Sequence, residues 1–203
     1  MSKDVIFSIF GETDEENFKK FRKAKDRFYK PFVDFCNKRR IKPDTISYLG
    51  LFMVIPFISL FYVNPWFGLI ILLVIHFLDG LDGAVARSRG GALTKGAITD
   101  ITCDYVSFFA IFLTFLFFGL MSHFWAALYA ISYVAMIFLV IIARSLKVKI
   151  FSVILRSKMI IYLAFLIWLI TGRNYFDPVL VFFSVYMVIT NYFLIKKIKC
   201  SVQ

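Results

Sequence analysis

Six apolar runs constrain the fold of this chain more than any other feature of its sequence. None of the six contains Asp, Glu, Lys or Arg, and 60% of the 203 residues are hydrophobic. Soluble domains are only about 45–50% apolar, and a helix needs about 20 apolar residues to cross a bilayer. Polar sequence beside the two shorter runs can extend their helices. We therefore predict an all-α integral membrane bundle of six transmembrane helices, with apolar runs at 46–63, 66–78, 105–121, 124–143, 159–171 and 178–195.

The basic residues lie almost entirely on one side of this predicted membrane domain. Of 24 Lys and Arg residues, 12 precede Ile46, three lie in 79–104, five in 144–158 and three in 196–199, whereas Arg173 alone lies in a loop on the other side. The positive-inside rule makes the basic side cytoplasmic, with both termini inside. The net charge of +11 then reflects topology and attraction to anionic lipid. We expect membrane lipid as a partner and no nucleic acid.

Residues 1–44 are predicted to form a cytoplasmic juxtamembrane segment before a membrane domain at 45–203. Thr13 and Glu16 match a capping box at a helix start. The residues that follow alternate Phe with Lys and Arg, which is typical of a basic amphipathic helix in the headgroup plane. A helix packed on the protein's own loops is the alternative. We expect Pro31 to kink this helix or to start a second one, and Pro43 to end it. The phenylalanines in this pattern are Phe18, Phe21, Phe28, Phe32 and Phe35.

Four aspartates interrupt the apolar sequence. Between residues 44 and 177 the only carboxylates are those of Asp79, Asp82, Asp100 and Asp104. An ionised side chain in a bilayer core costs at least about 2.5–3.5 kcal/mol. Four like charges close together also repel one another unless cations lie between them. Such residues therefore indicate a divalent metal site, and the alternatives are a buried polar network or an Mg²⁺ or proton pathway.

The spacing of the four aspartates brings them together at one membrane level. Asp79 and Asp82 are three residues apart, and Asp100 and Asp104 are four apart, so each pair shares a helical face. A rise of about 1.5 Å per residue over about 30 Å of hydrocarbon places both pairs near the cytoplasmic boundary. Small residues surround the first pair, and Arg87 offers a guanidinium suited to a phosphate oxygen.

The string Asp79-x-x-Asp82-Gly83-x-x-Ala86-Arg87, eight residues, Gly96-x-x-x-Asp100-x-x-x-Asp104 resembles the signature of the CDP-alcohol phosphotransferase family at every defining residue and spacing. The stretch from Ile41 to Ser47 looks like the family's Pro-Asn-x-x-Thr segment. Here Asp44 replaces Asn and Ser47 replaces Thr, so we carry no role onto Asp44.

The resemblance implies a reaction and a role for each matching residue. Such enzymes move a phosphatidyl-type group from a CDP-linked lipid donor, of the CDP-diacylglycerol or CDP-archaeol type, to a small polar alcohol and release CMP. The alternative within the enzyme class is a soluble CDP-alcohol donor with a lipid acceptor. Asp79, Asp82, Asp100 and Asp104 would hold two Mg²⁺ or Mn²⁺ ions, and Asp104 would also act as general base. The residues implied to bind the nucleotide are Asp82, Gly83, Ala86, Arg87 and Gly96. The resemblance also implies a homodimer.

The acceptor alcohol stays open at this point. The position of Arg144, Lys147, Arg156 and Lys158 looks like the basic acceptor pocket of relatives that use inositol phosphate or glycerol phosphate. Positive-inside bias is the alternative reason for this cluster. Against a phosphorylated acceptor, residues 104–108 look more like a run in phosphatidylserine synthases.

The three cysteines show no metal-binding spacing and are predicted to be free thiols. They are Cys36, Cys103 and Cys200. Cys103 lies between two of the aspartates in sequence, and we expect it to point away from their shared face.

Overall fold

The chain is all-helical over the residues that the computed structural model describes, which are 15–90, 94–146, 148 and 157–202. Five stretches are long and apolar enough to cross a bilayer, and the sixth apolar helix, α8 (Ser157–Thr171), is shorter at 15 residues. The predicted all-α, multi-pass membrane fold is thus confirmed, and helices cover the six apolar runs except for Met53 and residues 118–121. The five long stretches are Pro43–Val63, Pro65–Ser88, Ile98–Phe117, His123–Ala143 and Phe176–Cys200.

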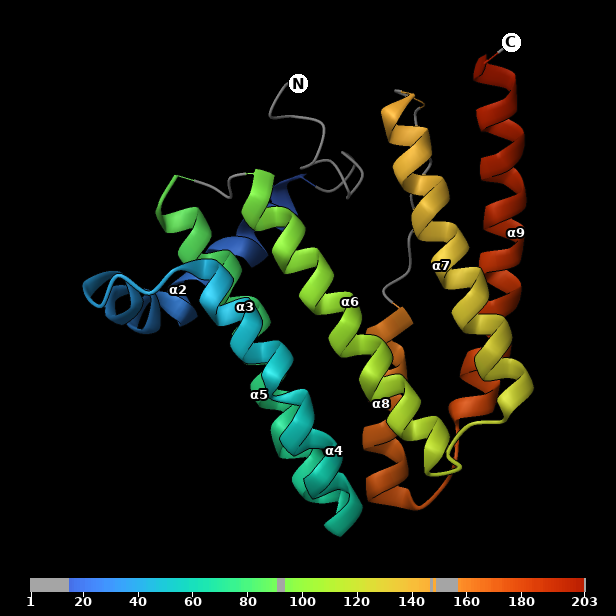
Figure 1. Cartoon of the computed structure of the whole chain (residues 1–203), viewed down its shortest axis with the longest axis horizontal. Helices are drawn as coiled ribbons and strands as arrows, with labels where there is room; N and C mark the ends of the chain where they lie inside the picture. The colour runs from blue at the N-terminus through green and yellow to red at the C-terminus, as the bar shows by residue number, and fades with distance from the viewer. Residues whose placement is uncertain (1–14, 91–93, 147, 149–156, 203) are drawn as a thin grey trace. The chain divides into compact units, whose positions relative to one another are not determined.

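The chain forms two compact units, which divide within α6 (Thr94–Phe117) between Thr114 and Phe115. The unit that carries the four aspartates contains α2, α3, α4, α5 and most of α6. In this unit α3 and α4 both lie along α5 (Figure 1). Its remaining helices are α2 (Glu15–Lys38), α3 (Pro43–Phe52), α4 (Val54–Val63) and α5 (Pro65–Ser88).

A local break separates α3 from α4 within the first membrane-spanning stretch. Pro56 has no amide hydrogen to donate to the carbonyl of Phe52, and its ring crowds that carbonyl, so the regular helix is interrupted at Met53. The chain then reverses at Asn64, whose side chain caps α5. Because of this turn, α5 runs back along α4 and α3, antiparallel to both.

Close packing holds α4 against α5. Gly68 of α5 lies so near to Phe61 that an ideal Cβ at Gly68 would be 2.7 Å from Cδ2 of that ring. Phe61 is almost fully buried and packs on Phe57 at 5.6 Å between ring centroids. A glycine at this position therefore permits the helix approach that any side chain would prevent.

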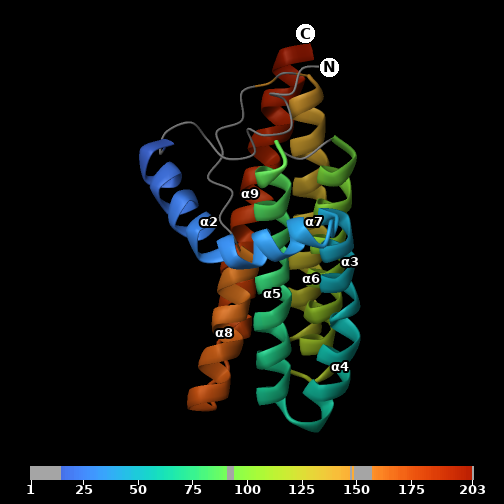
Figure 2. The ribbon, with the colours of Figure 1, turned by 90° about the vertical axis from the view of Figure 1, so that its left-hand side faces the viewer.

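Helix α2 continues through Pro31 as one helix, although its axis bends along its length (Figure 2). It ends at Lys38, and Arg40 turns the chain with φ 54°. Pro43 is the first residue of α3, so the prediction that it would end the preceding helix was wrong. Proline fits the first turn because an amide hydrogen there needs no helical partner. Thr13 of the predicted capping box lies outside the described residues.

The predicted amphipathic character of α2 agrees with the side chains that the structure describes. Phe28, Phe32 and Phe35 are 64%, 44% and 57% exposed, whereas Tyr29 and Val33 are buried in a cluster with residues of α5. One face of α2 therefore packs on the protein, and phenylalanines with basic neighbours cover another. Binding of that second face to a bilayer stays a prediction.

The other unit contains the end of α6 with α7 (His123–Ser145), α8 and α9 (Phe176–Val202). Helices α7 and α9 lie side by side (Figure 1), and the Asn191 amide donates a hydrogen bond to the carbonyl of Ser132 at 2.9 Å. Phe115 packs between Phe165 and Phe176, with ring centroids 4.8 and 5.3 Å away. Aromatic packing therefore forms much of the core of this unit.

Candidate active site

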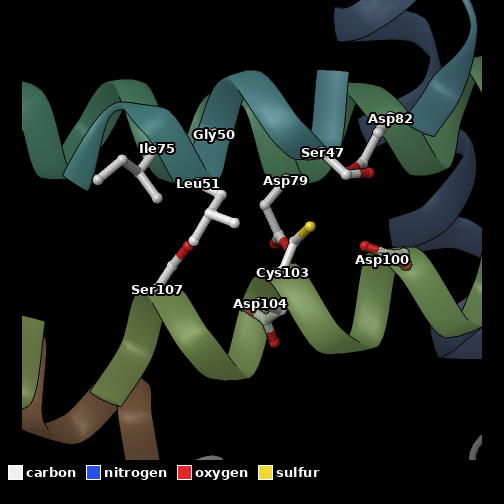
Figure 3. A pocket seen from close by; sticks show the side chains of 10 residues that line it. All are labelled: Ser47, Gly50, Leu51, Ile75, Asp79, Asp82, Asp100, Cys103, Asp104 and Ser107. Atoms are coloured by element: carbon white, nitrogen blue, oxygen red, sulfur yellow. The ribbon is translucent and has the colours of Figure 1, made fainter. Parts of the chain in front are cut away.

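All four predicted aspartates line one pocket, which is built from α3, α5 and α6 within a single unit (Figure 3). Its free volume is about 20 Å³, enough for one water-sized particle but far below the ~300–1,000 Å³ of ligand pockets. A nucleotide must therefore bind across its open side or widen it. The lining residues are Ser47, Gly50, Leu51, Ile75, Asp79, Asp82, Asp100, Cys103, Asp104 and Ser107.

Helix α5 contributes Asp79 and Asp82 from successive turns. Asp79 projects from α5 toward α6 (Figure 3), whereas the buried Asp82 reaches toward α3. One oxygen of Asp82 accepts a hydrogen bond from the Ser47 hydroxyl at 2.6 Å, and the other accepts one from the backbone N–H of Gly83. A carboxylate buried to 3% exposure needs such donors, because it has lost its water.

Helix α6 contributes Asp100, Cys103, Asp104 and Ser107. These positions follow the i, i+3, i+4, i+7 pattern of one helical face, so all four line the pocket. The prediction that Cys103 points away from the aspartates was wrong, because a residue three positions after Asp100 lies on the same side of the helix. The cysteine is buried, and all three cysteines are free thiols as predicted.

Two residues of α3 lie in or beside this site although we assigned them no role. Ser47 holds Asp82, and Oδ1 of Asp44 lies 3.2 Å from the position that a Cβ of Gly96 would occupy. Gly96 thus leaves room for the Asp44 carboxylate beside the start of α6. The only sequence signal for both was the imperfect match of residues 41–47 to the family's Pro-Asn-x-x-Thr segment.

The donor chemistry of the pocket suits a hard divalent cation. All four acidic side chains offer oxygen atoms, which Mg²⁺ and Mn²⁺ prefer. Within the described residues, however, no three His, Cys, Asp or Glu side chains are arranged to hold one ion together. The residues therefore fit a metal by type and by their common pocket, and side-chain rotation toward a shared centre is needed to bind it.

The other predicted nucleotide residues lie beside this pocket rather than in its wall. Gly83, Ala86 and Arg87 follow Asp82 along α5, and Gly96 lies one turn before Asp100. Arg87 lines a second cavity of about 310 Å³ between α2 and α5. Its Nη2 donates to Oδ1 of Asp26 at 2.6 Å, a partner that the sequence did not indicate.

Helix α2 reaches close to the aspartate pocket through Tyr29. The ring of Tyr29 is buried and packs on Phe77 of α5 at 5.2 Å between centroids. Burial raises the pKa of the Tyr29 hydroxyl, and the charges of Asp79 and Asp82 raise it further. The juxtamembrane helix therefore forms part of the surroundings of the site.

The predicted acceptor residues are only partly described. Arg144 lies in the last turn of α7, where the structure describes its backbone but not its side chain. Lys147 and Arg156 lie outside the described residues. Lys158 lies in the first turn of α8 and is half-buried. The basic acceptor cluster stays a prediction.

These features define an integral membrane protein with an oxygen-lined acidic site at the ends of two apolar helices. The sequence model of the CDP-alcohol phosphatidyltransferase family matches residues 40–195. The chain belongs to this family, which confirms the resemblance drawn from the aspartate motif.

Individual relatives match a shorter part of the chain. A phosphatidylinositol phosphate synthase of Streptomyces avermitilis is 38% identical over 88 residues, which cover 42% of this chain and 36% of that protein. One of Mycobacteroides abscessus is 36% identical over 85 residues, covering 40% and 38%. The matched stretch thus spans little more than a third of these relatives.

Solved structures extend the likeness to most of the chain. Phosphatidylinositol phosphate synthase of Mycobacterium tuberculosis, in complex with manganese and citrate, aligns with a TM-score of 0.70 at 19% identity, covering 84% of this chain and 88% of that one. The same enzyme with CDP-DAG bound gives 0.62 at 21% identity, covering 85% and 94%. At this identity the comparison establishes a common fold.

Proposed function

We propose that this protein transfers a phosphatidyl-type group from a CDP-linked lipid donor to the hydroxyl of a small polar alcohol and releases CMP. The observation that carries the proposal is the convergence of Asp79, Asp82, Asp100 and Asp104 on one pocket at the ends of α5 and α6. All four are the acidic positions of the family signature. The Mycobacterium tuberculosis relative of the same fold was solved with CDP-DAG bound, which supports a lipid donor.

Each signature residue then has a specific task. The carboxylate of Asp104 accepts the proton of the acceptor hydroxyl, whose oxygen forms a bond to the lipid-bearing phosphorus of the donor. The bond from this phosphorus to the CMP oxygen breaks, and CMP leaves with the electron pair. Arg87 binds a phosphate oxygen, Gly83 and Ala86 line the cytidine and phosphate pocket beside it, and Gly96 keeps the start of α6 free of a side chain. The hydrogen bond from Ser47 keeps Asp82 oriented.

We propose that Asp79, Asp82, Asp100 and Asp104 together hold two divalent cations, Mg²⁺ or Mn²⁺. Bound there, such ions supply charge neutralisation for the pyrophosphate and for the oxygens that attack and leave. Four carboxylates around one small pocket repel one another without cations, which supports this assignment. Manganese in the structure of the Mycobacterium tuberculosis relative supports it as well.

For the acceptor, we propose a phosphorylated alcohol, with inositol 1-phosphate as the first to test. Several sequence relatives are named phosphatidylinositol phosphate synthase. The basic residues Arg144, Lys147, Arg156 and Lys158 supply the matching charge. Serine is the competing acceptor, because residues 104–108 resemble phosphatidylserine synthases.

We further propose that the site and both termini face the cytoplasm, since 23 of the 24 basic residues lie on that side of six spans. Residues 1–44 would then form the juxtamembrane segment of a homodimeric enzyme, followed by the membrane domain at 45–203. The polar acceptor reaches this side from the cytosol and CMP leaves to it, whereas the CDP-linked lipid donor arrives through the bilayer.

The deciding experiment is CMP release by the purified protein from CDP-diacylglycerol with Mg²⁺ or Mn²⁺. The acceptors compared are inositol 1-phosphate, glycerol 3-phosphate, inositol and serine, with the Asp104→Asn protein as the blank. Release that requires one acceptor supports the reaction and identifies that acceptor. If release occurs instead from a soluble CDP-alcohol with a lipid acceptor, the donor and acceptor roles are reversed. If the protein fails to bind CDP and moves charge across vesicle membranes, the transferase proposal is rejected in favour of an ion pathway.

A further inference from the structure

The Arg87 guanidinium is held on two sides by groups from different helices. Its Nη1 lies 3.1 Å from the position that a Cβ of Gly83 would occupy, one helical turn earlier on α5. Its Nη2 donates to Asp26 of α2 at 2.6 Å. The Nε is buried, and within the described part of the chain it has no hydrogen-bond partner. The Arg87 side chain is therefore folded back over Gly83, and some of its N–H groups remain available to donate hydrogen bonds.

The segment of α2 that carries Asp26 is fixed on α5 at several further points. Tyr29 and Val33 are buried in a cluster with Leu81, Ala84 and Val85 of α5. The later part of α2 crosses α5 (Figure 2). Asp26 is thus presented by a packed helix rather than by a free surface segment.

Hydrogen bonds hold the C-terminal end of the same α2 segment against the end of α5. Nε of Arg89 donates to the side-chain oxygen of Asn37 at 2.8 Å, and the Asn37 amide donates to the Ser88 hydroxyl at 3.2 Å. Contacts at both ends of residues 26–37 therefore set where the Asp26 carboxylate lies relative to Arg87.

We propose that Asp26 is a positioning residue, which holds the Arg87 guanidinium in the orientation that binds a phosphate of the CDP-linked donor. The inference rests on the proposed function, because that function assigns a phosphate to Arg87. Arg87 has five N–H donors, so one contact to Asp26 leaves several for phosphate. A long arginine side chain loses considerable rotamer freedom when it binds, and an ion pair formed beforehand lowers that cost.

Simple electrostatics predicts the opposite effect of removing Asp26, which makes the proposal easy to test. Asp26 places a negative charge beside a site for an anion, so its removal by Asp26→Asn strengthens CDP binding if only long-range charge matters. If Asp26 positions Arg87, the same substitution weakens CDP binding. Asp34 is the matched control, since it lies on the same helix and lines the same cavity.

The experiment measures CDP affinity by titration calorimetry with Mn²⁺ on the full-length protein, and KM for donor and acceptor in the CMP-release assay. Positioning predicts that Asp26→Asn weakens CDP binding and raises donor KM on the order of 3- to 5-fold, because a part-exposed ion pair lies at the upper end of the surface range. It predicts unchanged acceptor KM, recovery in Asp26→Glu, and no weakening in Asp34→Asn.

A double-mutant cycle completes the test. In an Arg87→Lys background, Asp26→Asn should have no further effect on CDP affinity, because the group that it positions is gone. Unchanged or tighter CDP binding in Asp26→Asn overturns the proposal, and so does an equal loss in the Arg87→Lys background. A wild-type protein that does not bind CDP refutes the proposed function itself, and with it the inference.

Discussion

The hydroxyl of Ser47 on α3 donates a hydrogen bond of 2.6 Å to the carboxylate of Asp82 on α5. Both side chains are buried, with exposed fractions of 6% and 3%. This contact joins the first membrane-spanning stretch to the aspartate pocket. It therefore links helix packing to the orientation of a residue that we assign to metal binding.

Replacing Ser47 should weaken both the fold and the site. Ser47→Ala leaves one oxygen of Asp82 buried without its donor, which should destabilise the protein by about 1–3 kcal/mol. Thermal unfolding in detergent measures this loss, and Mn²⁺-dependent CDP binding should fall with it. Ser59→Ala is the control, because it removes a hydroxyl that bonds only to the carbonyl of Ile55 on an exposed face. Equal stability of Ser47→Ala and Ser59→Ala would show that the Asp82 contact contributes nothing.

Substitutions of the four aspartates should have two different effects, one on CDP binding and one on turnover. Asp79→Asn, Asp82→Asn and Asp100→Asn should abolish metal-dependent CDP binding, because each removes a negative oxygen ligand. Asp104→Asn should retain much of this binding, because Asp79, Asp82 and Asp100 stay as the main ligands and Asp104 only completes the two-metal site. Its turnover should fall about 10²- to 10⁴-fold, the range for loss of a general base. Calorimetry and CMP release measure the two effects on the same preparations. Near-normal turnover of Asp104→Asn would refute its assignment as base.

Gly68 should tolerate no side chain. In Gly68→Ala the new Cβ would lie 2.7 Å from the ring of Phe61, so α4 and α5 must move apart. We expect a destabilisation of about 1–3 kcal/mol, as for other overpacked cores. Gly50→Ala is the matched control for unfolding measurements, because its Cβ would meet only Leu78, at an ordinary 3.7 Å. If the two variants unfold at the same temperature, the α4–α5 contact at Gly68 is not tight.

The three thiols should react at different rates. Cys200 is exposed, whereas Cys36 and Cys103 are buried. Burial raises the pKa of the Cys36 thiol, an effect that the Arg89 charge partly opposes. Because a raised pKa keeps the thiol protonated at neutral pH, less reactive thiolate is present, and higher pH should accelerate labelling of Cys36. A maleimide should label one thiol quickly at pH 7, and Cys200→Ser should remove that fast phase. A fast phase that survives in Cys200→Ser would contradict this assignment.

A phosphorylated acceptor should depend on Lys158. Lys158→Ala should raise the KM for inositol 1-phosphate by at least about tenfold, since hydrogen bonds to charged groups contribute about 1.5–3 kcal/mol. The KM for CDP-diacylglycerol should not change. Lys196→Ala is the control, because it removes an equal charge from an exposed position on α9. An equal rise in both variants would indicate a general surface potential rather than an acceptor pocket.

Much of the fold and the acidic part of the site could be predicted because both depend on local periodicity. Apolar runs of membrane-spanning length predict helices, and the spacings of 79/82 and 100/104 predict shared faces. The same reasoning failed for Cys103, where the i+3 relation to Asp100 was not applied. It also failed at the end of α2, where the turn at Arg40 precedes the proline that was expected to stop the helix.

The amino-acid sequence by itself determined the helices, the class of the protein and its motif residues, since these follow from spacing along a single chain segment. Only the tertiary structure decided which residues complete the site. Ser47 lies 35 positions from Asp82, and Asp26 lies 61 positions from Arg87. Neither pair has a periodic relation, because each forms only when α3 or α2 packs on α5. Packing between helices, rather than the pattern within any one of them, therefore sets the surroundings of the aspartates and of Arg87.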